Sequence, residues 1–161
     1  MKYLPILSNG IARINVGLSS HDNKNMVELP FLIDTGATRT CINKFILIKK
    51  LGYTEDWLNE NKIILPKSKW PVMANGESLE VYGVPPIRLL IDGHEIYRNN
   101  KDEYFLTSDV APKLSFLLGT DMLSYFDMTF KYSENRVYYE FRQDRIRLQD
   151  KPGDSFAYQC D

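Results

Sequence analysis

In residues 31–38 the chain reads Phe31-Leu32-Ile33-Asp34-Thr35-Gly36-Ala37-Thr38. Three large apolar residues favour a buried strand, and the glycine after Thr35 permits a turn that a β-branched residue would resist. Asp34 therefore lies where a strand leaves the core, and the amides of the turn are suitable hydrogen-bond donors to its carboxylate. Asp-Thr-Gly is also a common turn sequence, so by itself it leaves the chemical role of Asp34 open.

The rest of the chain is dominated by short extended segments. We expect them at residues 3–18 with a break at Asn9-Gly10, and at 27–33, 71–74, 78–82, 87–91, 94–97, 104–106, 115–118, 128–132 and 137–141. Asn75-Gly76 and Asp92-Gly93 are expected hairpin turns, because these dipeptides readily take positive φ. The pattern predicts a mainly β fold, a closed or strongly curved β-barrel.

Two short helices interrupt the strands. Asn43 is the expected N-cap of a helix at residues 44–51, which Gly52 could end. Thr54, followed by two acidic residues, is expected to start a second helix that runs to Leu58.

Composition limits the class of protein. The chain has 161 residues, 20 Lys+Arg against 21 Asp+Glu, and 43% hydrophobic residues. We expect one globular domain at residues 1–141 and a charged tail at residues 142–161. Because there is no basic excess, no nucleic-acid partner is expected. No run approaches ~18 apolar residues and the N-terminus lacks a signal-peptide core, so we expect no membrane partner and a cytoplasmic location.

The metal-binding and thiol residue types are sparse. Cys41 and Cys160 lie far apart in the sequence and are expected to be reduced, Cys41 as a small core residue. His21 and His94 have no second ligand at a suitable spacing, so we expect no metal site.

Two further segments follow Asp34 in order. Met73-Ala74-Asn75-Gly76-Glu77 comes about 40 residues later, and Leu117-Leu118-Gly119-Thr120-Asp121-Met122-Leu123 about 40 residues after that. Taken singly, the first could be an ordinary hairpin and the second a core strand. The ordered set resembles the retropepsin family, the single-domain retroviral-type aspartic proteases, over about residues 11–130. The terminal hairpin looks more like bacterial members of the family than viral ones.

The resemblance implies a β-barrel of acid-protease type and an aspartic endopeptidase without cofactor. It implies a catalytic loop of Asp34, Thr35 and Gly36. It also implies a substrate-binding surface of Ala37, Met73, Ala74, Asn75, Gly76, Leu117 and Leu118, in which Leu117 and Leu118 line an apolar floor and a specificity pocket would favour apolar side chains. The mechanism needs two carboxylates at one water, and no second Asp-Thr-Gly or Asp-Ser-Gly exists in the chain. We therefore expect a homodimer that acts on polypeptides.

Two alternatives remain on the same residues. The chain could be a non-catalytic peptide-binding or dimerisation module on the same fold, since fold does not determine function. Asp34 could also be a phosphoryl acceptor, but Thr35-Gly36 supplies neither the second acid nor the lysine that such chemistry requires.

Ala37 leads to a prediction about pH. A Ser or Thr at this position could donate a hydroxyl hydrogen bond that favours the ionised carboxylate, and Ala cannot. We therefore expect peptidase activity to extend to mildly acidic or neutral pH, as measured by a pH–rate profile. A strongly acidic, pepsin-like optimum would contradict this expectation.

Overall fold

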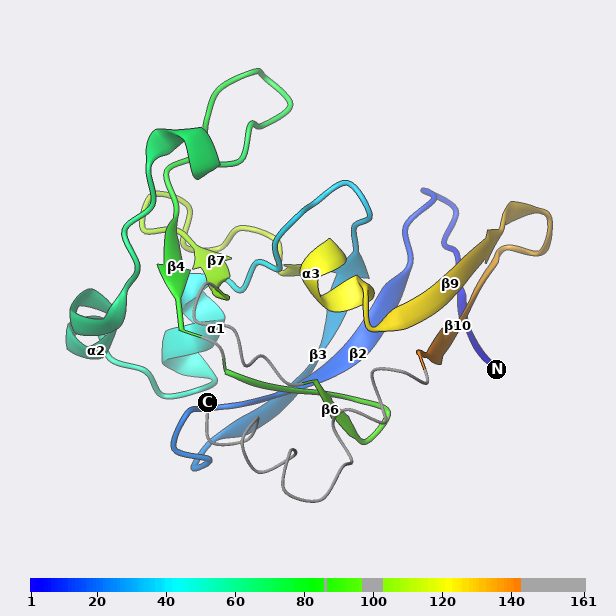
Figure 1. The fold of residues 1–161 in the computed structure, drawn as a ribbon, viewed down its shortest axis with the longest axis horizontal. Helices are drawn as coiled ribbons and strands as arrows, with labels where there is room; N and C mark the ends of the chain where they lie inside the picture. Colours follow the sequence, from blue (N-terminus) through cyan, green and yellow to red (C-terminus); the bar gives the residue numbers. More distant parts are fainter. Residues whose placement is uncertain (86, 97–102, 143–161) are drawn as a thin grey trace.

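The structure, a computed structural model, describes residues 1–85, 87–96 and 103–142 (Figure 1). The strands are β1 (Lys2–Pro5), β2 (Arg13–Ser19), β3 (Met26–Ile33), β4 (Tyr82–Val84), β5 (Arg88–Ile91), β6 (His94–Ile96), β7 (Phe105–Thr107), β8 (Leu117–Leu118), β9 (Phe126–Lys131) and β10 (Arg136–Phe141). The helices are α1 (Lys44–Lys49), α2 (Glu55–Asn61) and α3 (Thr120–Leu123), with 3-10 turns η1 (Lys67–Lys69) and η2 (Tyr132–Glu134). The mainly β prediction is confirmed. Apart from Arg142, the tail expected at 142–161 lies outside the described residues.

Three open sheets build the fold. The central five-stranded sheet has the order β6-β5-β2-β3-β8, in which β8 pairs parallel to β3 and the other pairs are antiparallel. β4 and β7 form a two-stranded sheet, and β1-β10-β9 form a three-stranded sheet. Within the described ranges no sheet closes on itself, so the expected closed barrel is wrong.

Isolated bridges of one residue each connect the strands where a barrel would have continuous pairing. Cys41 bridges Leu117 of β8 on one side and Leu106 of β7 on the other, and Ile63 bridges Gly83 of β4. The two bridges of Cys41 link the central sheet to the sheet of β4 and β7. Because each bridge is one residue long, they do not form the continuous ladder that a barrel requires.

The two predicted helices, α1 and α2, begin at the residues that the sequence indicated. Asn43 Oδ1 accepts a hydrogen bond from the Ile46 amide at 2.8 Å, and Thr54 Oγ1 accepts one from the Trp57 amide at 3.0 Å. Asn43 Nδ2 also donates to the Leu114 carbonyl at 2.9 Å, which ties α1 to the segment before β8. Among the described residues, no helix is long and apolar enough to cross a lipid bilayer.

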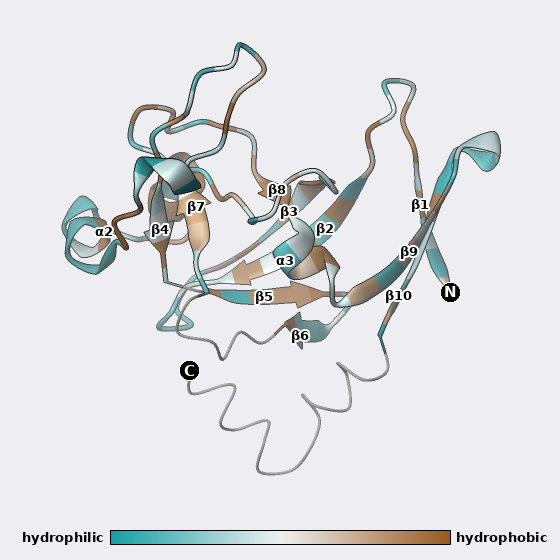
Figure 2. Ribbon diagram, turned by 45° about the horizontal axis from the view of Figure 1, so that its top comes forward, coloured by the Kyte–Doolittle hydropathy of each residue, from teal (hydrophilic) through white to brown (hydrophobic). Residues whose placement is uncertain are grey.

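The core has two parts. The larger part packs against the central sheet and includes the fully buried Leu18, Phe31, Leu89 and Leu118. The smaller part contains Cys41, Leu65, Val81, Tyr104 and Leu106, with Trp70, Leu79, Leu114 and Leu117 packed against it. Figure 2 shows apolar stretches on β5 and β7. The smaller core supports the segment between η1 and β4.

Gly119 marks a close crossing of two chain segments. It is buried, and its backbone is extended, with φ −90° and ψ −178°. A Cβ on Gly119 would lie 2.7 Å from the carbonyl carbon and 2.8 Å from the backbone nitrogen and oxygen of Arg39. The residue is therefore required by space and not by φ. The crossing holds the end of β8 against the segment that follows Asp34.

Replacing Gly119 tests this crossing. We expect Gly119→Ala to lower the free energy of unfolding by about 1–3 kcal/mol or more, because backbone atoms must move to admit the methyl group. Gly17→Ala is the matched control, since a Cβ there would be 3.5 Å from its nearest neighbour, an ordinary contact. Urea unfolding of both variants measures the difference, and equal midpoints would show that the crossing is not tight.

Candidate active site

Asp34 is held by the strand that precedes it and by the turn that follows. Its amide donates to the Leu118 carbonyl at 3.1 Å, which continues the pairing of β3 with β8. The Ala37 amide donates to the Asp34 carbonyl at 3.2 Å and closes the turn. The Gly36 amide donates to Asp34 Oδ1 at 3.0 Å. The carboxylate is thus oriented by its own turn, as the sequence predicted.

Gly36 lies beside the carboxylate of Asp34. It is not among the glycines with positive φ, so the turn does not need glycine for its backbone conformation. A Cβ on Gly36 would lie 3.4 Å from Asp34 Oδ1. The absent side chain leaves the space beside the carboxylate open to solvent.

A cleft of about 1010 Å³ lies next to Asp34. One wall is Asp34 together with the residues from Gly36 to Arg39. A second wall is the segment from Ser68 to Ala74, and the smaller core forms much of the rest through Leu79, Val81, Leu106, Leu114 and Leu117. The segment between α2 and β4 and the loop after β3 project to the same side of the sheets (Figure 1). The volume lies at the upper end of the range that is usual for ligand-binding pockets.

The structure brings six of the ten residues expected from the sequence to this cleft. They are Asp34, Gly36, Ala37, Met73, Ala74 and Leu117. The other four do not line it: Thr35 is exposed on the turn, Asn75 and Gly76 are exposed at the tip of the hairpin, and Leu118 is fully buried. Leu117 lines the cleft and Leu118 does not, because neighbouring residues of a strand face opposite sides of the sheet.

The expected hairpin at residues 71–79 is present in a short form. Val72 and Ser78 make a single bridge, and the Met73 amide donates to the Glu77 carbonyl at 2.8 Å. Gly76 takes φ +85° at the tip. Val72 and Met73 are 69% and 46% exposed although both line the cleft. The hairpin thus exposes two apolar side chains at the cleft, where neither is packed into the core.

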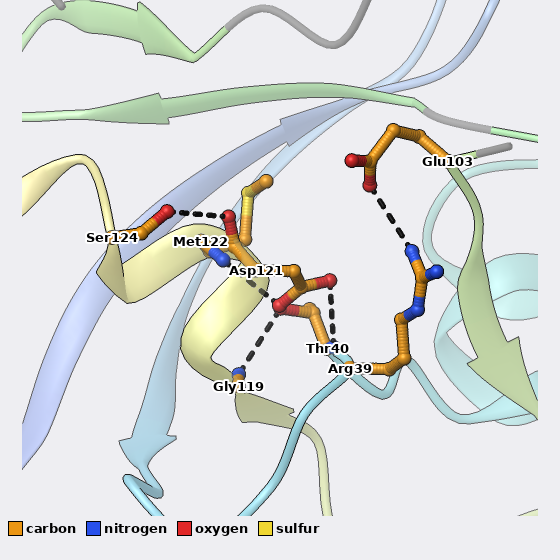
Figure 3. A network of polar contacts seen from close by, with 7 residues as sticks. All are labelled: Arg39, Thr40, Glu103, Gly119, Asp121, Met122 and Ser124. Carbon is orange, nitrogen blue, oxygen red and sulfur yellow. Dashed lines mark hydrogen bonds and ion pairs between the residues drawn. The ribbon is translucent and has the colours of Figure 1, made fainter. Parts of the chain in front are cut away.

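A hydrogen-bond network that the sequence did not predict joins the turn to α3 (Figure 3). Thr40 donates to Asp121 twice, from Oγ1 to Oδ1 at 2.8 Å and from its amide to Oδ2 at 3.0 Å. The Met122 amide donates to Oδ1 at 2.8 Å, and the buried Gly119 amide donates to Thr40 Oγ1 at 3.2 Å. The only sequence signal was an acidic residue in the first turn of a short helix.

A second pair at the cleft was also missed. Arg39 donates from one terminal nitrogen to Glu103 Oε2 at 3.1 Å, and its guanidinium carbon lies 4.2 Å from the centre of the Tyr104 ring. All three residues line the cleft. Arg39 is far in sequence from Glu103 and Tyr104, so no local pattern could have connected them.

Cys41 lies in the cleft wall but is 8% exposed. Burial raises the pKa of its thiol to about 12, and the charges of Asp121 and Asp34 add to the effect. The thiol is therefore protonated at neutral pH and is a poor nucleophile, which confirms the prediction of a core cysteine. Within the described part of the chain, no group of three or more His, Cys, Asp or Glu residues could hold a metal ion.

No protein-family model matches the sequence, and no curated protein matches it significantly. Among solved structures, the chain is similar to the crystal structure of a retropepsin-like aspartic protease from Rickettsia conorii, with a TM-score of 0.53 and 20% identity over 87% of this chain and 89% of that one. The fold is retropepsin-like. The resemblance drawn from three ordered sequence segments is thus confirmed for the fold. In this retropepsin-like fold, β8 lies beside β3 and ends at the turn that carries Asp34.

Thr40 gives a test of the network that supports the turn. Thr40→Val keeps the shape of the side chain but removes the acceptor of the Gly119 amide and one of the donors to Asp121 Oδ1, so we expect a loss of about 1–3 kcal/mol in the free energy of unfolding. Thr38→Val, at an exposed position, is the control and should change it by less than about 0.5 kcal/mol. Denaturant unfolding checks both, and a neutral Thr40→Val would mean that water replaces the hydroxyl.

Proposed function

We propose that the chain is an aspartic endopeptidase that hydrolyses polypeptides as a homodimer. The observation that carries the proposal is the place of Asp34: its carboxylate stands at the end of β3, in a cleft below a hairpin, on a retropepsin-like fold. The turn leaves one side of the carboxylate open, so a water molecule and a peptide bond can approach it.

The chemistry needs a second acid. A carboxylate can take a proton from water, but the peptide carbonyl must gain a proton from another group. Two carboxyl groups about 3 Å apart share one proton because both cannot ionise, which provides the base and the acid together. Among the described residues the cleft has two other carboxylates, but Glu103 is paired with Arg39 and Asp121 accepts hydrogen bonds from Thr40 and Met122. We therefore assign the second acid to Asp34 of a second copy.

In the proposed reaction, the ionised Asp34 takes a proton from water as the water oxygen attacks the carbonyl carbon. The protonated Asp34 of the other copy gives its proton to the carbonyl oxygen. The carbon–nitrogen bond then breaks as the first Asp34 gives its proton to the nitrogen and the other Asp34 takes a hydroxyl proton back from the tetrahedral intermediate. A carboxylic acid and an amine are released, and the pair again holds one proton. No cofactor takes part.

Features of the isolated chain fit this assembly. Thr35 and Gly36 are exposed, so a second turn related by two-fold symmetry can meet them. In the proposal Thr35 links the two turns and Gly36 lets the substrate backbone approach. The hairpin residues Met73, Ala74, Asn75 and Gly76 would cover an extended substrate, and Val72 and Met73 would contact its apolar side chains.

The proposal is tested with purified protein and an unfolded polypeptide. We expect Asp34→Asn to lower the cleavage rate by a factor of about 10² or more, because an amide cannot act as the base. Mixing wild type with an equal amount of Asp34→Asn should lower the activity per wild-type chain by about half, since random pairing converts active dimers to mixed ones. Asp127→Asn, which changes an exposed acid on β9, is the control variant for both measurements.

Each result has a clear meaning. Cleavage that survives Asp34→Asn excludes Asp34 as the catalytic acid. An activity that the mixed sample retains in full excludes the shared site. If wild type cleaves nothing at any pH but binds peptides, the chain is a peptide-binding module on the retropepsin-like fold.

A further inference from the structure

The ion pair of Arg39 and Glu103 lies in a cleft whose walls are otherwise largely apolar. Arg39 lies in the same wall of the cleft as Asp34. Glu103 comes just before β7, and the two side chains point toward each other (Figure 3). Their side chains are 28% and 29% exposed. Both charges are therefore partly shielded from water but can still be reached from the cleft.

Arg39 is held in one orientation. Its guanidinium lies 4.2 Å from the centre of the ring of Tyr104, which is 7% exposed and packed in the smaller core. One terminal nitrogen donates to Glu103. Its Nε and its other terminal nitrogen donate to no group among the described residues. A fixed, planar cation thus retains hydrogen-bond donors that are available to a ligand.

We propose that Arg39 determines specificity by binding an acidic side chain of the substrate near the scissile bond. This inference rests on the proposed peptidase function. A guanidinium binds a carboxylate through parallel hydrogen bonds, and it does so more strongly where water is partly excluded. Glu103 holds Arg39 in place and balances its charge while the cleft is empty. The cleft would accept apolar side chains along most of its length and one carboxylate beside Arg39.

The charged residues that line the cleft are three acids and two bases, but their contacts favour an acid over a base as the ligand beside Arg39. Of its carboxylates, Glu103 is paired with Arg39, Asp121 is bound by Thr40 and Met122, and Asp34 is the proposed catalytic group. Lys69, on the hairpin side, adds a second positive charge to the lining. In a two-fold dimer each copy contributes one Arg39, so the preference would occur on both sides of the scissile bond.

The test uses sets of peptides that share an apolar scissile pair and carry Glu, Gln or Lys at one flanking position at a time. At the best position we expect wild type to cleave the Glu peptide with a kcat/KM about tenfold above the Gln peptide. Arg39→Met should reduce this ratio to about one, and Arg39→Lys should give an intermediate ratio because the charge remains without the planar fork. Arg88→Met is the matched control, since Arg88 is also ion-paired with a glutamate, Glu95, but does not line the cleft.

Reversal of the pair separates recognition from folding. The double variant Arg39→Glu with Glu103→Arg keeps an ion pair but places the acid beside the catalytic turn. We expect its preference to change from the Glu peptide to the Lys peptide, which a purely structural role of the pair would not produce. If wild type cleaves Glu and Gln peptides equally at every position, or if Arg39→Met and Arg39→Lys keep the wild-type ratio, the inference is overturned.

A binding measurement distinguishes this inference from the proposed function. Fluorescence anisotropy of the same peptides with Asp34→Asn reports recognition without hydrolysis. The inference is supported, even if wild type proves inactive, when the Glu peptide binds more tightly than the Gln peptide and this difference in affinity disappears once Arg39→Met is added. Hydrolysis by wild type with no Glu preference in cleavage or binding supports the peptidase and overturns the inference.

Discussion

The backbone of Arg39 crosses Gly119 so closely that a methyl group on Gly119 would meet three backbone atoms. The site depends on this contact. It holds β8 parallel to β3, so that the Leu118 carbonyl can receive the Asp34 amide. On the other side of the crossing, Thr40 reaches Asp121 and binds the turn to α3. A carboxylate that acts in catalysis has to be held within a fraction of an ångström. Two strands and a helix meet at the turn of Asp34, for which we propose that role.

The same crossing explains why one part of the cleft wall is apolar and another carries a charge. The segment that leaves Asp34 continues to Cys41, which bridges β8 and β7 and joins the central sheet to the smaller core. That core supports the hairpin and provides apolar surface. Arg39 lies between the turn and the core and contributes a charge stacked on Tyr104. The proposed function and the proposed specificity thus come from neighbouring residues, one at the end of a strand and one held by packing.

Local signals in the sequence predicted local structure well. Asn43 and Thr54 cap helices because a short polar side chain can bond an amide three residues ahead, and Asp92-Gly93 turns with both φ angles positive. The expected barrel closure was wrong, since closure depends on which strands pair and over what length. The network of Thr40 with Asp121 and the pair of Arg39 with Glu103 were missed for the same reason: each joins residues that are remote in the chain.

The sequence by itself determined that a strand would bring Asp34 to a turn, that a hairpin and an apolar strand would follow it, and that one chain has a single Asp-Thr-Gly. These features depend on residues within a few positions of one another. Only the tertiary structure decided that Leu117 faces the cleft while Leu118 is buried, that Gly119 is required by space and not by its φ, and that a cation lies beside the proposed catalytic turn. Such features depend on the distance between segments, and that distance exists only after the chain has folded.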